Sequence, residues 1–237
     1  MERKTVSQGL AAICLAVMFG LTPAGPALAN PLNSWKTSCS VDSGSITKKG
    51  NTRTFKTSRN HCEGGVFKQR AEIFSGHISP TTKGTWLFET HVAMTTGSTQ
   101  QFTLFQIHDS RLGCAPPFSM DVTPDGRLLL KSDIKTGKGE SCIRGALNDR
   151  LSKGRIRRDG TEQKLSVLVD FDGKGGFAVQ VSIDGVAQIS GAYDPSKQPA
   201  EFLSKKFYFK HGVYSKNMFD YVMTSRGMKV SKVRLAN

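Results

Sequence analysis

Four side chains in this sequence would together supply the groups that remove a proton beside a carboxylate: Arg70, Gln106, His108 and Tyr214. An arginine and an amide grip a carboxylate and neutralise its charge, the arginine through a bidentate fork. Histidine has an ordinary pKa of about 6.5, which suits a general base near neutral pH. A tyrosine beside a cationic group donates a proton to a leaving oxygen, or accepts one if its pKa is depressed.

A carboxylate neutraliser, a base and an acid are the three parts of β-elimination from a uronic acid. The C5 proton of the sugar becomes acidic enough to remove only when the charge of the adjacent carboxylate is quenched. The 4-O-glycosidic oxygen must then be protonated as it leaves. The residue types therefore indicate chemistry on an acidic polysaccharide, provided that the chain folds so that they converge.

The stretch 207–214 (FYFKHGVY) reads as a β-strand with two unlike faces, because side chains alternate along a strand. One face carries Tyr208, Lys210, Gly212 and Tyr214, and the other carries Phe207, Phe209, His211 and Val213. We predict that the second face packs in a core, where His211 makes local hydrogen bonds. The first face is predicted to line a groove for a charged, extended ligand, with Gly212 letting something large approach the backbone.

Two other stretches divide in the same way. In 101–109 (QFTLFQIHD), strict alternation places Gln106 and His108 on one face with Phe102 and Leu104, and Thr103, Phe105 and Ile107 on the other. In 68–74 (KQRAEIF), Arg70 and Glu72 share a face opposite Ala71 and Ile73. If the three strands are neighbours, their polar faces line one concave sheet.

The pattern of the whole chain is all-β, with turn dipeptides such as Asp172-Gly173 and Asp184-Gly185 between alternating runs. Strands are predicted at Thr85–Met94, Gln101–His108, Phe118–Val122, Arg127–Lys131, Lys164–Phe171, Phe177–Ile183, Val186–Ile189, Lys206–Tyr214 and Met228–Leu235. Only Pro195–Leu203 is predicted to form a helical turn or two. This composition favours a two-sheet β-sandwich or jelly roll, concanavalin-like, with a concave glycan groove.

The first 29 residues are predicted to be a cleaved signal peptide. Arg3 and Lys4 precede a short apolar run, and 27–29 (ALA) has the form of a signal-peptidase site. We therefore expect a secreted or periplasmic protein whose residues 30–237 form a single domain, a monomer that does not span a membrane. Removal of this peptide leaves 31 basic and 18 acidic residues. Such an excess of positive charge favours the capture of polyanions.

Four cysteines remain in the mature chain, and an even number in an exported chain favours disulfides. Four cysteines allow three pairings. We prefer the shortest loops, Cys39–Cys62 and Cys114–Cys142. Zinc is the rival interpretation, but neither the Cys nor the His spacings resemble a zinc site. No metal or cofactor motif is evident, so none is expected.

Three short blocks of the sequence resemble the three signature blocks of alginate lyases of polysaccharide lyase family 7, in the same order. These blocks are Arg70–Ile73, Gln106–His108 and Tyr208–Tyr214. The resemblance implies a β-jelly roll that cleaves alginate by β-elimination without a cofactor. Arg70 and Gln106 would neutralise the carboxylate at subsite +1, and His108 and Tyr214 would transfer protons, with Tyr214 as the acid. Lys210 and Tyr208 would bind substrate, and Glu72 would support Arg70.

Two positions depart from that family. Phe74 stands where a second arginine is usual, and 215–217 (SKN) follows the last tyrosine in place of Asn-Gln. Both departures lie near the expected groove, so the sugar recognised need not be a typical alginate. Glucuronan, the substrate of related β-jelly-roll lyases, is the competing polymer.

Two other classes of function remain open. A non-catalytic glycan-binding module would keep Arg70 and Lys210 for charge recognition without needing His108 or Tyr214. The basic run Arg150–Arg158 is the best argument for nucleic-acid binding, but it has no interleaved aromatic residues. We interpret it as a solvated loop and expect an acidic polysaccharide, not nucleic acid, as the partner.

Overall fold

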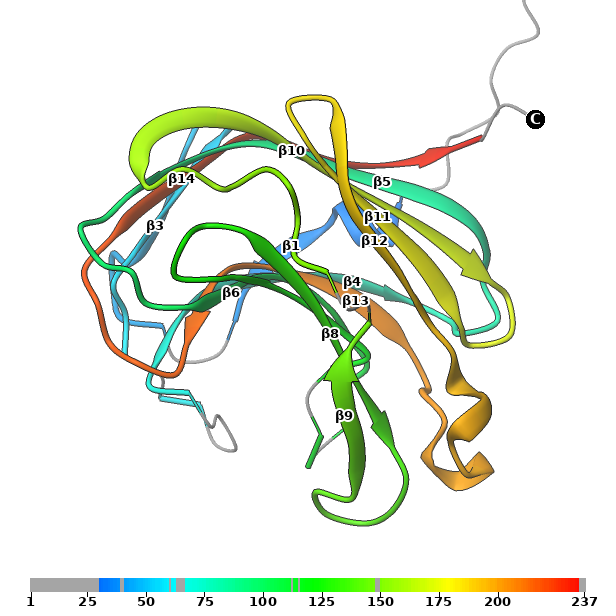
Figure 1. Ribbon diagram of the computed structural model, residues 1–237. Coiled ribbons are helices and arrows are strands. Elements are labelled where there is room, and N and C mark those ends of the chain that lie inside the picture. The colour runs from blue at the N-terminus through cyan, green and yellow to red at the C-terminus, as the bar shows by residue number, and fades with distance from the viewer. Residues whose placement is uncertain are drawn as a thin grey trace, which may run out of the picture.

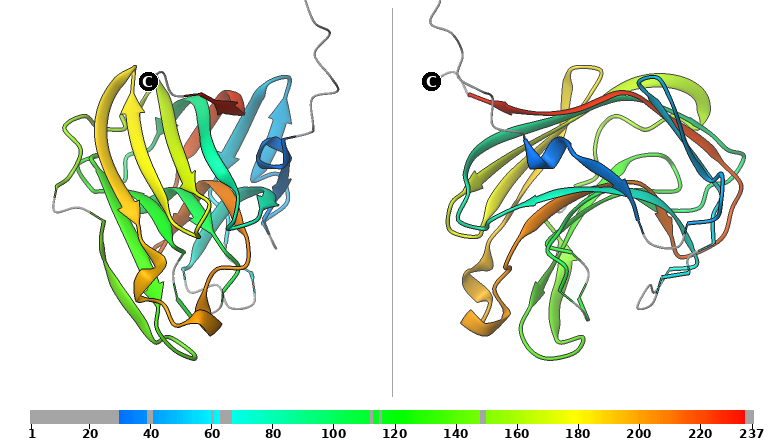
Figure 2. Two further views of the ribbon diagram at one scale, coloured as in Figure 1. Left: turned by 90° about the vertical axis from the view of Figure 1, so that its right-hand side faces the viewer. Right: turned by 180° about the vertical axis from the view of Figure 1, so that it is seen from behind.

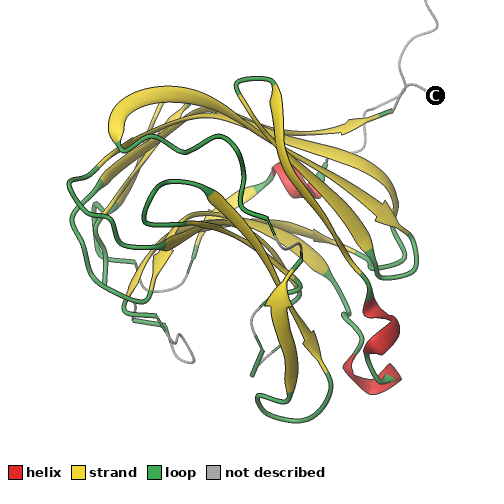
Figure 3. Cartoon of the chain, viewed as in Figure 1, coloured by secondary structure: helices red, strands yellow, loops and turns green. Residues whose placement is uncertain are grey.

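The computed structural model shows two antiparallel sheets of seven strands each, packed face to face (Figure 1). It describes residues 30–38, 41–59, 61–62, 67–111, 113–114, 116–147 and 150–234. The predicted signal peptide, residues 1–29, lies outside the described residues. Among the described residues, helix is confined to three short 3-10 turns, η1 (Pro31–Asn33), η2 (Pro195–Lys197) and η3 (Ala200–Phe202), drawn red in Figure 3. The all-β sandwich and the helical turns within Pro195–Leu203 are confirmed.

The sheet that carries the three stretches is called the site sheet here, and the other the back sheet. In spatial order, the site sheet consists of β1 (Trp35–Thr37), β4 (Gln69–Ile78), β13 (Phe207–Ser215), β6 (Phe102–His108), β7 (Phe118–Val122), β8 (Leu128–Lys135) and β9 (Cys142–Ala146). The back sheet consists of β12 (Val186–Tyr193), β11 (Phe177–Ile183), β10 (Asp159–Asp172), β5 (Lys83–Thr95), β14 (Val222–Val233), β3 (Thr52–Lys56) and β2 (Ile46–Lys49). Figure 2 shows the two sheets as curved layers, one arching over the other.

Aromatic rings from both sheets fill the space between them. Phe105 of β6 packs against Phe88 of β5 and Phe209 of β13, with ring centroids 4.9 and 5.2 Å away. His211 is fully buried among them, and its ring nitrogens bond the carbonyl of Leu104 at 3.1 Å and Oγ of Ser225 at 2.7 Å. The predicted core face of β13, including its buried histidine, is confirmed. Because one face of β13 packs in this core, its other face, with Tyr208 and Lys210, points away from the core.

The prediction of strict alternation over Phe102–His108 is wrong at its start. The register between β6 and β7 shifts between Thr103 and Phe105, so Leu104 forms a bulge in β6. A bulge adds one residue to the strand, so the residues before it point to the face opposite to the one that strict alternation predicts. Thr103 therefore lies across from Tyr214 and Asp121, on the face of Gln106.

Gly212 serves a different purpose from the one predicted. Its φ is +144°, and a Cβ there would lie 2.1 Å from the carbonyl oxygen of Ala71 on β4. The group that comes close to this glycine is therefore the backbone of the neighbouring strand, not a ligand. Glycine is needed for β13 to pair closely with β4 at the centre of the site sheet.

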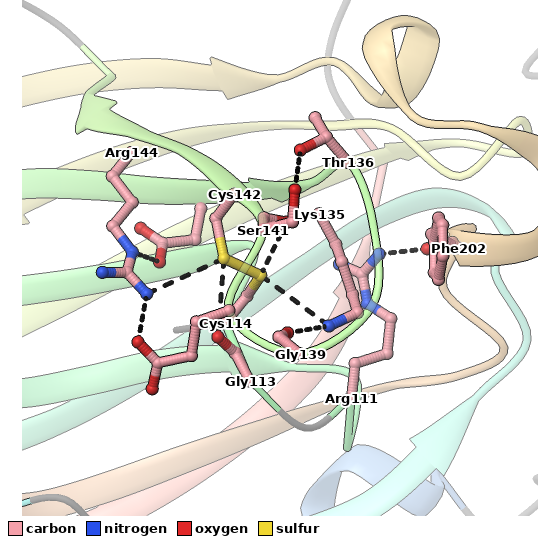
Figure 4. The surroundings of a disulfide bond; sticks show 12 residues. Arg111, Gly113, Cys114, Lys135, Thr136, Gly139, Ser141, Cys142, Arg144 and Phe202 are labelled. Carbon is pink, nitrogen blue, oxygen red and sulfur yellow. Dashed lines mark hydrogen bonds and ion pairs between the residues drawn. A yellow bond between two sulfur atoms is a disulfide. The ribbon is translucent and has the colours of Figure 1, made fainter.

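The predicted Cys114–Cys142 disulfide is confirmed, with Cα atoms 6.1 Å apart (Figure 4). It joins the segment after β6 to the β8–β9 hairpin. Lys135 reinforces this junction by donating from Nζ to the carbonyl of Gly139 at 2.6 Å. On the loop-entropy account, a bond that closes such a loop stabilises by about 3 kcal/mol. Cys39 lies outside the described residues, so its pairing with Cys62 stays a prediction.

Candidate active site

The three stretches are neighbouring strands, as the lining of one groove requires. β13 lies between β4 and β6 in the site sheet. Lys210 lies directly across from Gln106 on β6 and from Phe74 on β4, and Tyr214 lies across from Arg70. Residues directly across a ladder share a face of the sheet. The assumption of adjacency, which sequence alone did not provide, is confirmed.

Glu72 organises the centre of this face. Its Oε2 lies 3.3 Å from Nε of Arg70 and 3.4 Å from Nζ of Lys210, and its Oε1 accepts from Nε2 of Gln106 at 3.1 Å. All four side chains are buried, Glu72 to 1% exposure. Two cations and one carboxylate give the cluster a net charge of one positive unit. One further carboxylate, supplied by a ligand, would balance it.

A cleft of about 350 Å³ opens beside the cluster. Arg70 and Lys210 line it together with Tyr208, Phe74 and Ser110. Gln106, His108 and Tyr214 do not line the cleft itself and lie around it. Phe74, one of the two positions that depart from the resemblance described above, therefore lies at the groove as predicted.

His108 lies at one end of the cluster, next to Tyr208. The two rings stack with centroids 5.3 Å apart. The backbone N–H of Ser110 donates to Nδ1 of His108 at 2.8 Å, and Oγ of Ser110 donates to the hydroxyl of Tyr208 at 3.0 Å. Because Nδ1 accepts this bond, the neutral ring carries its proton on Nε2. His108 therefore offers an N–H to a ligand, not the lone pair of a base.

Burial lowers the pKa of His108 to about 3, and the positive charges of Lys210 and Arg70 act in the same direction. The ring is consequently neutral near neutral pH, where a polyuronate is ionised. Burial also raises the pKa of the Tyr208 hydroxyl. Both groups at this end of the cluster are thus held in their uncharged forms.

Tyr214 lies at the other end of the cluster. Its hydroxyl accepts from the backbone N–H of Phe67 at 3.2 Å, and the guanidinium carbon of Arg70 lies 4.4 Å from the centroid of its ring. No hydrogen bond or ring contact joins Tyr214 to His108 within the described residues. The structure thus brings Arg70, Gln106 and Glu72 together, with the two proposed proton carriers on opposite sides.

The turn after His108 is held from two directions. Asp109 forms an ion pair with Arg111 and accepts from Oγ of Ser204 at 2.8 Å, while Arg111 also donates to the carbonyl of Phe202. The Cys114–Cys142 bond anchors the same segment on its other side. Ser110 itself has a φ of +63°, a value that is uncommon outside glycine. These contacts hold the strained residue whose N–H sets the tautomer of His108.

Sequence reasoning missed Ser110 and Lys206 at the cleft. Lys206 lines it, and its alternation with Tyr208 and Lys210 was a signal that would have found it. Ser110 follows the end of β6 in a turn whose conformation has no signature in the sequence. His77 also lines the cleft.

The basic run Arg150–Arg158 is not wholly a solvated loop. The guanidinium of Arg158 donates to the carbonyls of Ser98, Gln100 and Thr123, at 2.9 to 3.0 Å, and lies over the ring of Phe102. It is a structural clamp, and burial lowers its pKa.

In the part of the chain that the structure describes, no three His, Cys, Asp or Glu side chains gather as for a metal ion. No helix among the described residues is long and apolar enough to cross a membrane.

A pH prediction follows from His108. Its folded-state pKa of about 3 lies below the ordinary 6.5, so the unfolded chain binds a proton that the folded chain excludes between these values. The free energy of unfolding should therefore fall as the pH falls below 6.5, by roughly 3 kcal/mol per 2.5 pH units from this group. Denaturant titrations from pH 7 to 4 should show a shallower dependence in His108→Gln. An equally steep dependence in that variant would contradict the assignment.

Comparison with known proteins supports the fold. No protein-family model and no curated protein sequence matches the chain. Among solved structures, alginate lyase A1-II′ of polysaccharide lyase family 7 is similar with a TM-score of 0.54 and 16% identity, over 81% of this chain and 85% of that one. Alginate lyase PA1167 from Pseudomonas aeruginosa has the same TM-score and identity, over 81% and 87%. The endo-β-1,4-glucuronan lyase of the fungus Trichoderma reesei has a TM-score of 0.54 and 11% identity, over 86% and 90%. The chain has the jelly-roll fold of these polysaccharide lyases.

Proposed function

We propose that this chain is a polysaccharide lyase that cleaves a 1,4-linked polyuronate by β-elimination, with alginate as the leading substrate and glucuronan as the alternative. The observation that carries the proposal is the buried Glu72 cluster, whose excess positive charge matches one uronate carboxylate. The similar structures bear the names of an alginate lyase and a glucuronan lyase, which supports this class of substrate.

In the proposed mechanism, Arg70, Lys210 and the amide of Gln106 hold the carboxylate of the sugar at subsite +1. These groups neutralise the negative charge of the carboxylate, which makes the C5 proton of the sugar more acidic. His108, neutral and protonated on Nε2, adds a further hydrogen-bond donor to the carboxylate. This assigns His108 to charge stabilisation, and leaves the removal of the C5 proton to a phenol.

Tyr214 is our candidate for both proton transfers: its phenolate accepts the C5 proton, and the phenol so formed gives that proton to the leaving 4-oxygen. Its oxygen accepts from the backbone N–H of Phe67, and its ring lies against the Arg70 guanidinium. Tyr208 is the rival phenol because it contacts His108. Burial raises the pKa of Tyr208, which makes its proton harder to release, so we retain Tyr214.

A row of polar side chains extends the site across the sheet, as a polymer requires. Lys210, Gln106, Ser119 and Lys131 lie in register on β13, β6, β7 and β8. Neighbouring strands are about 4.8 Å apart, so the row spans roughly 14 Å, enough for several sugar rings. Lys131 forms an ion pair with Asp121 and keeps 40% of its side chain exposed. We propose that it meets a uronate several sugars away from the bond that is cut.

The assay uses purified protein with alginate, its two homopolymer blocks and glucuronan, and follows the ultraviolet absorbance of the new C4=C5 double bond. A rise with at least one polymer is expected. Folded protein that produces no absorbance from any polyuronate would overturn the proposal. Competition by DNA at matched salt then tests whether the basic surface prefers a polyuronate over nucleic acid.

A non-catalytic acidic-glycan-binding module is the second candidate, since no hydrogen bond or ring contact among the described residues joins His108 to Tyr214. Charge recognition by Arg70 and Lys210 alone would suffice for it. Binding of the same polymers without a double-bond signal would favour this function. In either case we propose export of the chain to a secreted or periplasmic location, which the Cys114–Cys142 bond supports.

A further inference from the structure

A second cleft, of about 520 Å³, lies at an edge of the sandwich and shares no lining residue with the first. It lies where β1 and η1 meet the β2–β3 hairpin, which Figure 2 shows side by side in its left view. Its size is within the roughly 300–1,000 Å³ of small-molecule sites. Trp35 and Met228 supply its apolar walls, and Lys48, Arg53, Asn33 and Asn51 supply polar groups.

Two cations of this cleft stand in an unfavourable arrangement. Lys48 of β2 and Arg53 of β3 lie directly across from each other in the ladder. Like charges in this position destabilise a sheet. Within the described residues neither side chain forms a hydrogen bond or an ion pair, and residues 45–58 contain four basic residues and no acidic one. Burial lowers the pKa of Arg53, which shows that its charge is partly withdrawn from water without a partner.

The other polar groups of the cleft include hydrogen-bond donors. The indole N–H of Trp35 is buried and has no acceptor among the described residues. Oδ1 of Asn33 already accepts from the backbone N–H of Val230 at 2.9 Å, which leaves its amide N–H groups for another partner. No acidic side chain lines the cleft. Donors and unpaired cations without a carboxylate form a site for an anion.

We propose that this edge cleft is a second, non-catalytic binding site for an acidic sugar of the polymer that the groove takes. The inference rests on the proposed function for the identity of the polymer. The cations bind the sugar carboxylate, the amides bind hydroxyl groups, and Trp35 and Met228 contact the apolar face of the ring. A polymer held at both places stays near the groove between cuts, because the second attachment raises its effective concentration.

The test compares the double variant Lys48→Gln/Arg53→Gln with Lys49→Gln/Lys56→Gln. The control removes the same two charges from the same hairpin, at exposed positions that do not line the cleft. Calorimetry with tetramers of guluronate, mannuronate and glucuronate measures binding. The two indole N–H signals in ¹H–¹⁵N spectra locate it, since the chain contains two tryptophans.

In the unchanged protein we expect two binding events for the preferred tetramer, one of which shifts the Trp35 signal. The cleft variant should lose that event, and its affinity for the polymer should fall about tenfold, while its turnover of tetramers and its melting temperature do not fall. The control should lose far less. Equal losses in both variants, or a Trp35 signal that no tetramer shifts, would overturn the inference. Absence of the double-bond signal, by contrast, refutes only the lyase.

Discussion

Replacing Tyr214 by phenylalanine should lower kcat on the preferred polyuronate by about 10²–10⁴-fold and change KM little. General acid–base groups typically contribute this much to a rate, whereas the ring that stacks with Arg70 and Phe67 is retained. The substitution also removes the oxygen that accepts the N–H of Phe67. Steady-state rates and the melting temperature, measured on the same preparation, separate loss of chemistry from loss of fold.

Tyr208→Phe is the matched control, because Tyr208 is on the same face of β13 and also loses one hydroxyl contact, to Ser110. We expect a loss of about tenfold or less, since Tyr208 is assigned to binding. A larger loss of kcat in Tyr208→Phe than in Tyr214→Phe would assign the proton transfer to Tyr208, the phenol beside His108. Equal indifference of both variants would favour a binding module over an enzyme.

Replacing Glu72 by glutamine should lower the free energy of unfolding by about 3–5 kcal/mol, the range found when one partner of a buried ion pair is removed. Arg70 and Lys210 would then remain buried as two cations without a carboxylate. The shape of the side chain is kept, so the effect reports its charge. The value of kcat/KM should fall as well, because the cations are no longer held in place. Denaturant unfolding and initial rates measure the two effects.

Glu89→Gln is the control for the removal of one carboxylate. The Glu89 side chain is 32% exposed and pairs with Lys164 at 2.7 Å on the outer face of the back sheet. Pairs of this kind contribute about 1 kcal/mol or less. If the two substitutions cost the same, Glu72 is an ordinary ion pair and does not organise the site.

Much of the arrangement followed from periodicity alone. The two faces of β13 were correct because Phe207, Phe209 and His211 alternate without interruption with Tyr208 and Lys210. β7 and β11 begin and end at the predicted residues for the same reason. Strict alternation is a strong signal when one face is buried.

Other parts had no comparable signal. β2 and β3 (ITKK and TRTFK) were missed because they are short and polar, with β2 at the edge of the back sheet and β3 next to it, so neither shows a clear alternation of apolar and polar residues. The bulge at Leu104 depends on how β6 pairs with β7, which no local pattern encodes. The distribution of the proton carriers was unforeseen for a related reason: Tyr208, not Tyr214, lies across from His108, and register is a property of the assembled sheet.

The Cys114–Cys142 bond has a consequence for when the protein works. The turn that fixes the His108 tautomer lies between the end of β6 and this bond. In a compartment rich in glutathione the two thiols stay free, and that turn has lost one of its two anchors while both sheets keep their cores. Completion of the turn that holds His108 should therefore lag behind folding of the sandwich, and turnover should rise as the two thiols are oxidised.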